Sequence, residues 1–195
     1  PRGTGQWLAI YCMEGAGRAR VGKTEHSLAS GDLLFLEPTR GHEYEADSVN
    51  PWSIFWVHFI GQRAKDYVES LGWTREAPVL HVPETGILLE SFEDLYRHTL
   101  HGMSDAEMMA MGTAWARLLG LARIGIRARE SRARLMEDKI LRVMSKLRET
   151  PQADWPVGEM ARLAGMSSGY FSEQFRQRTG SPPQTFLIRL RLQLA

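Results

Sequence analysis

The chain has 195 residues, of which 43% are hydrophobic and 24% are charged, the composition of an ordinary globular protein with room for one large or two small domains. No apolar run approaches the roughly 18 residues of a membrane-spanning helix, and the first residues lack the pattern of a secretory leader. The single cysteine, Cys12, forms neither an internal disulfide nor a cysteine-based metal site. We therefore expect a cytoplasmic protein and exclude secreted disulfide domains, membrane proteins and zinc fingers.

The net charge of +1 conceals two oppositely charged parts. Residues 1–126 contain 11 Lys and Arg against 16 Asp and Glu, whereas residues 127–195 contain 13 against 7. A basic second part suits a polyanion such as nucleic acid, and chance clustering of solvated charges is an equally good explanation. The asymmetry favours two domains.

The first 60 residues have a pattern typical of short β-strands separated by turns. Short apolar runs at 7–13, 33–36 and 53–59 alternate with Gly and Pro, and they are rich in aromatic and branched side chains. Strands at about ten-residue spacing predict a small antiparallel barrel or sandwich. Within it, we interpret Gly-Ala-Gly at 15–17 as a hairpin turn.

Helical periodicity replaces this pattern after residue 61. We expect a short helix at 62–71 and amphipathic helices at 83–100 and 104–126. The stripe on the last helix either packs on its own barrel or pairs with its copy in a second subunit, which makes it the candidate dimer contact. Its members are Met108, Met111, Trp115, Leu118 and Ala122.

A charged segment separates these helices from the rest. Residues 127–134 read Arg-Ala-Arg-Glu-Ser-Arg-Ala-Arg, almost without apolar side chains. We expect residues 127–136 to form a linker, with an exposed charged helix as the alternative. A helix ended by Pro151 follows, and residues 137–195 are predicted to be entirely helical.

Two short helices with a tight turn between them lie within residues 157–178. Gly165 falls where the first helix must end, and Ser167 is placed to cap the second with its hydroxyl. Met166 and Phe171 would form a hydrophobic staple, while Phe171 and Phe175 face the core. This is the arrangement of a helix–turn–helix, whose second helix enters the major groove of DNA. An ordinary pair of packed helices with a charged face is the alternative.

With both phenylalanines inward, the helix at 168–178 offers six candidates for DNA contact. Arg176 and Arg178 could pair with phosphates, Arg176 could instead bind guanine, and Glu173 could accept a hydrogen bond from cytosine N4. The six candidates are Ser168, Gly169, Ser172, Glu173, Arg176 and Arg178.

The helical part carries a specific motif, Met160-Ala161-Arg162-Leu163-Ala164-Gly165-Met166-Ser167, continued by Tyr170-Phe171-Ser172 and Thr179-Gly180-Ser181-Pro182. With it, residues 139–195 resemble the DNA-binding region of AraC-type transcriptional regulators. The first part contains Gly31-Asp32-Leu33-Leu34-Phe35, Gly41-His42-Glu43-Tyr44 and Pro51-Trp52-Ser53-Ile54-Phe55-Trp56. These segments resemble the cupin-like sensing and dimerisation domain of the arabinose-regulator branch.

The resemblance implies an α+β protein of two domains. Residues 1–126 would form a cupin-like antiparallel β-barrel of the jelly-roll type, with strands at about 1–60 and two or three helices after them. Residues 137–195 would form the first all-α helix–turn–helix subdomain and the start of a connecting helix near Pro183. The family's second helix–turn–helix is absent, so we expect the chain to be truncated within its DNA-binding region.

The resemblance also places a small-molecule effector, a sugar or a related metabolite, inside the barrel. Arg2, Tyr44 and Trp56 fall where sugar-contacting residues would be, and His42 is a further candidate pocket residue. Ile54 takes the place of a polar histidine in the arabinose sensor, which argues against arabinose. Trp56 could stack on a sugar ring and Arg2 could pair with hydroxyl or carboxylate oxygens. Plain barrel core is the alternative for Trp56 and Tyr44.

A metal-dependent cupin enzyme is one alternative function. Such enzymes use a His-x-His pair, a Glu and a later His, whereas Glu25-His26 supplies one histidine and only His42 matches the later position. We therefore predict no metal, no cofactor and no catalytic residue. A ligand-binding interaction module that does not bind DNA is the other alternative.

The function that the resemblance implies is that of a ligand-responsive transcriptional regulator. It would act as a homodimer on double-stranded DNA, with RNA polymerase as a further partner and without membrane association.

Overall fold

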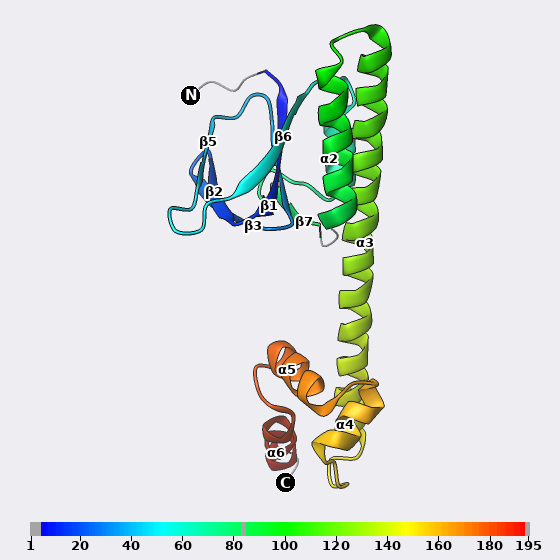
Figure 1. Ribbon diagram of the computed structural model, residues 1–195. Coiled ribbons are helices and arrows are strands. Elements are labelled where there is room, and N and C mark those ends of the chain that lie inside the picture. The colour runs from blue at the N-terminus through cyan, green and yellow to red at the C-terminus, as the bar shows by residue number, and fades with distance from the viewer. Residues whose placement is uncertain (1–4, 83–84, 194–195) are drawn as a thin grey trace. The chain divides into compact units, whose positions relative to one another are not determined.

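The computed structural model describes residues 5–82 and 85–193, and the chain divides into two compact units. We call residues 1–129 the β-domain and residues 130–195 the helical domain. Figure 1 shows that the β-domain contains all the strands drawn, together with the helices that follow them. The two-domain α+β fold expected from the sequence is confirmed.

In the described part of the chain, seven strands form two antiparallel sheets. The first sheet has the order β6-β1-β4-β7 and the second has the order β3-β2-β5. The sequence did not predict β7, which is only three residues long. The strands are β1 (Trp7–Glu14), β2 (Ala16–Val21), β3 (Thr24–Ala29), β4 (Asp32–Leu36), β5 (His42–Ala46), β6 (Ser53–Phe59) and β7 (Val79–His81).

Strand β1 is buried on both faces, which explains why its sequence is apolar without alternation. Leu8 and Ile10 belong to the core between the two sheets. Trp7, Ala9 and Tyr11 point the other way, into a core shared with helices. The β-domain therefore consists of three layers, two sheets and a helical layer.

The helical layer contains α1 (Ala64–Ser70), α2 (Thr85–Leu100) and the first part of α3 (Asp105–Glu149). In Figure 1, α2 and α3 run side by side next to the strands. Leu88 and Phe92 of α2 are almost fully buried in the same core as Tyr11, and the Tyr11 and Phe92 rings stack with centroids 5.5 Å apart. This packing fixes the helices on the outer face of the first sheet.

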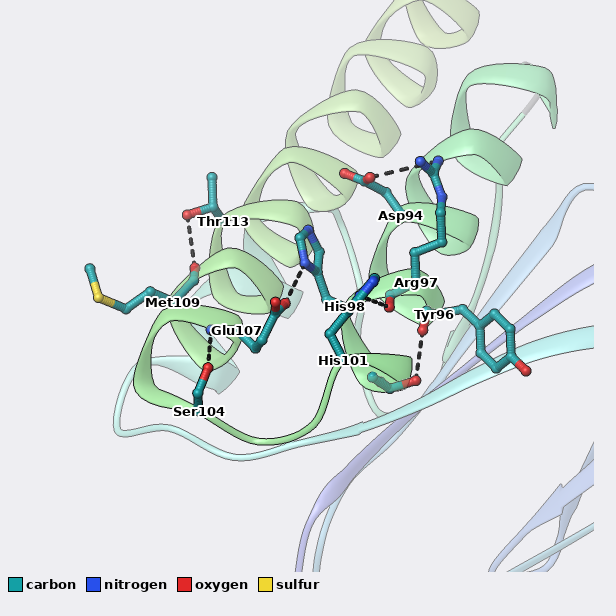
Figure 2. A network of polar contacts seen from close by, with 10 residues as sticks. Asp94, Tyr96, Arg97, His98, His101, Ser104, Glu107, Met109 and Thr113 are labelled. Carbon is teal, nitrogen blue, oxygen red and sulfur yellow. Dashed lines mark hydrogen bonds and ion pairs between the residues drawn. The ribbon is translucent and has the colours of Figure 1, made fainter.

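The turn between α2 and α3 is held by polar contacts, shown in Figure 2. The Nδ1 of His98 lies 2.7 Å from a carboxylate oxygen of Glu107, which joins the two helices. The Ser104 hydroxyl accepts a hydrogen bond from the Glu107 backbone N–H at 3.3 Å and so caps α3. Gly102, with φ of +97°, allows the chain to reverse.

The predicted end of the third helix at residue 126 is wrong, because α3 continues to Glu149. Residues 127–136, for which we expected a linker, have helical backbone and nearly all are exposed. They contain no Gly or Pro, and Arg, Ala and Glu favour helix, so nothing in this segment stops it. The charged-helix alternative therefore describes its local structure.

The hairpin turn predicted at residues 15–17 is also wrong. Gly15 adopts φ of +73°, but it connects β1 to β2, which lie in different sheets, and the next two residues already belong to β2. Gly17 is required for packing, because a Cβ there would lie 2.0 Å from Cε3 of the Trp52 ring. The glycines mark a change of sheet and a close contact with an aromatic ring.

The helical domain combines the end of α3 with α4 (Val157–Ala164), α5 (Ser168–Thr179) and α6 (Pro183–Gln193). The core of this domain is apolar. Across both domains, no helix within the described ranges has the length and hydrophobicity needed to cross a bilayer. The fully or almost fully buried core residues are Ile140, Val143, Leu147, Met160, Ala161, Ala164, Phe171, Phe175 and Leu187.

Candidate functional site

Helices α4 and α5 form the expected helix–turn–helix. Gly165 ends α4 in the left-handed conformation, with φ of +65°, and the Met166 N–H donates to the Ala161 carbonyl at 2.9 Å. Met166 packs on the domain core, as its predicted role in a staple requires. The predicted cap by Ser167 is wrong in one respect. Ser167 has the extended backbone of an N-cap, but its hydroxyl makes no capping hydrogen bond with the described residues. The backbone bonds at Gly165 and the packing of Met166 are therefore what fixes the turn.

Helix α5 has one buried face and one exposed face. Phe171 and Phe175 are 0% exposed, with ring centroids 5.4 Å apart, which confirms that both point into the core. Ser168, Gly169, Glu173 and Arg176 are exposed and Ser172 is partly exposed. The exposed face carries hydrogen-bonding groups over the first three turns, as reading of base edges requires.

The exposed polar groups of α5 are linked to one another. Glu173 accepts hydrogen bonds from Gln177 Nε2 at 2.9 Å and from the Arg176 guanidinium at 3.1 Å. These two contacts, the Gln177 bond first, hold the pKa of Glu173 below its ordinary value. The Ser172 hydroxyl donates to the Ser168 carbonyl at 2.8 Å and remains able to accept. Sequence reasoning overlooked Gln177, although its spacing of four residues from Glu173 places it on the same face.

Arg178, the sixth candidate, is placed differently. Its guanidinium forms an ion pair with Glu137 of α3, within the helical domain. The candidate DNA contacts therefore separate into an outward-facing group and one arginine bound to a neighbouring helix.

The candidate effector residues Trp56 and Tyr44 face the space between the two sheets. In the strand register, Trp56 lies opposite Ile10 and Tyr44 lies opposite Ala19, and both of these partners belong to the core between the sheets. Yet Trp56 is 61% exposed and Tyr44 is 45% exposed, because β6 and β5 are edge strands. Neither residue fits the alternative of plain barrel core.

Other rings lie beside these two side chains. The Tyr44 ring is 6.5 Å from Trp52 and 6.4 Å from His42, and Trp56 is 5.5 Å from His58. His42 Nδ1 lies 3.0 Å from the Arg40 carbonyl, so Nδ1–H donates there and Nε2 of the neutral ring can accept from a ligand. Ile54, partly buried, packs against the same core between the sheets.

Two further expectations concern this region. Arg2, the fourth candidate effector residue, lies outside the described residues. In the part of the chain that the structure describes, no group of three His, Cys, Asp or Glu side chains could hold a metal ion.

The candidate dimer stripe is mostly part of the β-domain core. Leu118 and Ala122 are 0% exposed, so they are occupied by their own domain, which is the alternative that the sequence left open. Met111 and Trp115 pack partly on the same core, and the Trp115 ring is 4.7 Å from Phe59. Only Met108, which is 53% exposed, is largely free to meet a partner.

An open apolar groove of about 940 Å³ adjoins Met108, between β6 and the helices α2 and α3. No pattern of residues predicted this groove, because it forms where the helical layer meets the edge of the sheet. Its wall includes Phe59, Phe92, Tyr96, Met103, Met108 and Trp115.

These observations define a two-domain protein in which a two-sheet domain with exposed aromatic side chains on its edge strands is joined in one chain to a helix–turn–helix domain. Residues 1–110 match the AraC-like ligand binding domain, and residues 147–186 match the bacterial regulatory helix-turn-helix proteins of the AraC family. The chain belongs to the AraC family. Both matches describe parts of regulatory proteins and not of enzymes.

Relatives of this chain include regulators of several bacteria. The MmsAB operon regulatory protein of Pseudomonas aeruginosa is 31% identical over 96% of this chain and 61% of its own length. The uncharacterised HTH-type transcriptional regulator YidL of Escherichia coli is 21% identical over 97% of this chain and 61% of its length. The crystal structure of the AraC-like transcriptional activator CuxR is 13% identical, with a TM-score of 0.41, over 97% of this chain and 66% of that one. This chain thus spans about three fifths of the length of these two curated relatives.

Proposed function

We propose that this chain is the sensing domain and one reading head of a ligand-responsive transcriptional regulator, and that α5 reads the major groove of double-stranded DNA. The observation that carries the proposal is the division of α5 into a face buried by Phe171 and Phe175 and an exposed face with Ser172, Glu173 and Arg176. In a helix–turn–helix, residues at the N-terminal part of the second helix contact base edges in the major groove, and this exposed face lies on that part of α5.

The side chains on this face suit base edges. Arg176 can donate two hydrogen bonds to guanine O6 and N7, and Gln177 can bind adenine N6 and N7. Glu173 can accept from cytosine N4 once it lies deep in the groove, and in the free protein it orders both neighbours. The proposed reading group is therefore Glu173, Arg176 and Gln177.

The test is DNA binding by the chain at several salt concentrations. A duplex is first selected from a randomised library, and its affinity is then measured for the wild type, Arg176→Ala and the control Arg63→Ala. Arg63 is an exposed arginine of the β-domain, so the control removes the same charge elsewhere. We expect Arg176→Ala to weaken binding by about 1–3 kcal/mol and to relax base preference at one position. Binding that is absent, or that ignores salt, would refute the proposal.

We further propose that the effector is a sugar or related metabolite bound between the two sheets. The exposed Trp56 ring offers a stacking surface, while His42 Nε2 and the Tyr44 hydroxyl offer hydrogen bonds to ligand hydroxyls. Arg2 is proposed as a contact on the family resemblance alone.

A thermal-shift screen of sugars and sugar acids on the chain tests the effector proposal. Trp56→Ala should abolish the shift that a hit produces. Tyr67→Ala, which removes an exposed aromatic ring of α1, should retain it. A shift that survives Trp56→Ala would place the ligand elsewhere.

We also propose that the regulator is a cytoplasmic homodimer, with RNA polymerase as a further partner. Met108 and the partly buried Met111 and Trp115 lie beside the apolar groove, so the dimer contact is assigned to this side of α3. Met108→Glu should lower the mass found by sedimentation equilibrium, whereas Val49→Glu, a change at a 91% exposed loop residue, should not. An unchanged mass for Met108→Glu would remove this assignment.

A further inference from the structure

Arg178 lies on the buried side of the reading helix. Phe171, Phe175 and Arg178 follow one another at spacings of four and three residues, so they share one face of α5. Both rings are 0% exposed, and Arg178 continues their face in the last turn of the helix. It therefore points away from Arg176 and the rest of the exposed face.

The partner of Arg178 lies at the rim of the same core. Its guanidinium forms an ion pair with the carboxylate of Glu137, which stands 41 residues earlier in the chain, on α3. Glu137 precedes the buried Ile140 by three residues, so it flanks the side of α3 that enters the helical-domain core. Both charged side chains are about half exposed. The pair thus joins the end of α5 to α3 across the edge of the core.

A second charge on α3 lies near the other helix of the motif. Lys139 follows Glu137 by two residues, a spacing that turns a side chain to the opposite flank of the helix. Its Nζ lies 3.9 Å from the position that a Cβ on Gly165 would occupy, at the C-terminal end of α4. A cation is favourable there, because the last carbonyl groups of a helix carry partial negative charge. One flank of α3 therefore contacts α5 through Glu137, and the other places Lys139 near the end of α4.

We propose that Arg178 is a positioning residue, which together with Glu137 sets the orientation of the reading helix against α3, and that it does not bind a DNA phosphate. The proposal rests on the proposed function, because orientation matters only if α5 enters a groove. It replaces the phosphate contact that the sequence suggested for Arg178. Exposed ion pairs contribute little on their own, so its loss should weaken binding to DNA by only about two- to five-fold.

The salt dependence of DNA binding distinguishes a positioning role of Arg178 from a contact with a DNA phosphate. A residue that neutralises one phosphate contributes about 0.9 to the slope of log K against log salt concentration. We expect Arg178→Gln to weaken binding of the library-selected duplex by about two- to five-fold while leaving this slope unchanged. A slope smaller by about 0.9 in Arg178→Gln would show a phosphate contact and overturn the proposal.

Variants of Glu137 test the pair from its other side. Glu137→Gln should weaken binding as Arg178→Gln does, whereas Glu149→Gln should not weaken it. Glu149 is the matched control, because it also removes one negative charge from α3 but pairs with Lys146 of its own helix. If Glu137→Gln strengthens binding, loss of a repelling charge outweighs positioning and the proposal fails.

The exchanged pair, Glu137→Arg with Arg178→Glu, completes the test. We expect it to restore binding to within about two-fold of the wild type, because the ion pair is rebuilt in reverse. Binding weaker than that of Arg178→Gln alone would mean that position 178 faces the DNA, and would overturn the proposal. Thermal unfolding of each variant shows whether it is folded, and the exchanged pair retains the contact if a single variant does not fold. Failure of the wild type to select any duplex would instead refute the proposed function.

Discussion

Replacement of Phe175 by alanine tests whether the helical domain depends on the aromatic core behind the reading helix. Phe175 is 0% exposed, and its ring centroid lies 5.4 Å from Phe171 and 5.3 Å from Phe186 of α6. The change removes a ring that joins α5 to α6 and leaves a cavity, which costs about 3–5 kcal/mol in free energy of unfolding. Small domains have about 0.05–0.15 kcal/mol of stability per residue, so this loss is comparable to the whole stability of residues 130–195.

Hydrogen exchange of the full chain, followed by mass spectrometry, measures this loss domain by domain. We expect the protection of α4, α5 and α6 to fall at least about a hundred-fold, while β1 and β4 in the β-domain keep theirs. Phe175→Leu retains an apolar side chain and should lose less protection. Gln177→Ala, an exposed change on the same helix, should alter it by about two-fold or less. A fall of less than ten-fold in Phe175→Ala would show that this ring does not hold the domain together.

Three further predictions concern other parts of the molecule. Gly17→Ala forces a Cβ toward the Trp52 ring, so it should lower the free energy of unfolding of the β-domain by about 1–3 kcal/mol. Gly120→Ala has open space around it and should raise that free energy by about 0.5–1 kcal/mol. Thermal unfolding compares the two variants, and equal effects would contradict the close contact at Gly17. The buried Tyr11 hydroxyl has no hydrogen-bond partner among the described residues, so Tyr11→Phe should leave stability unchanged or raise it by up to about 1 kcal/mol at pH 7. Burial raises the pKa of Tyr11 from 10.0 to about 12, so between these pH values the tyrosine ionises in the unfolded chain and the wild type loses stability. The difference in free energy of unfolding between Tyr11→Phe and the wild type should therefore grow as the pH rises through this interval. Denaturant unfolding at pH 7 and pH 11 measures it, and an equal difference at both pH values would contradict the reasoning. Finally, Glu173→Gln should strengthen binding to random-sequence duplex and reduce the ratio of affinities for the selected site and random DNA, because a carboxylate that repels phosphate and also orders Arg176 is lost. A larger affinity ratio in a competition assay would refute this role of Glu173.

Elements whose signals are local could be predicted from the residues alone. Gly165 and Gly180 end α4 and α5 in the left-handed conformation, and both phenylalanines of α5 are buried where helical spacing predicts. The apolar runs at 7–13, 33–36 and 53–59 correspond to β1, β4 and β6. In each case the residues that carry the signal lie within one or two turns or strands of one another, so propensity and periodicity suffice.

Which side chains are available to a partner depends on how distant segments pack together. The stripe on α3 is equally apolar at Met108 and at Leu118, yet one is exposed and the other is fully buried, because the helix meets the sheet over only part of its length. Arg178 and Arg176 look alike in the sequence, yet one pairs with Glu137 on α3 and the other lies on the exposed face of α5. Trp56 is exposed although it lies on the inner face of its sheet, since β6 is an edge strand. These outcomes depend on segments far apart in the chain, and no local pattern of residues records where such segments meet.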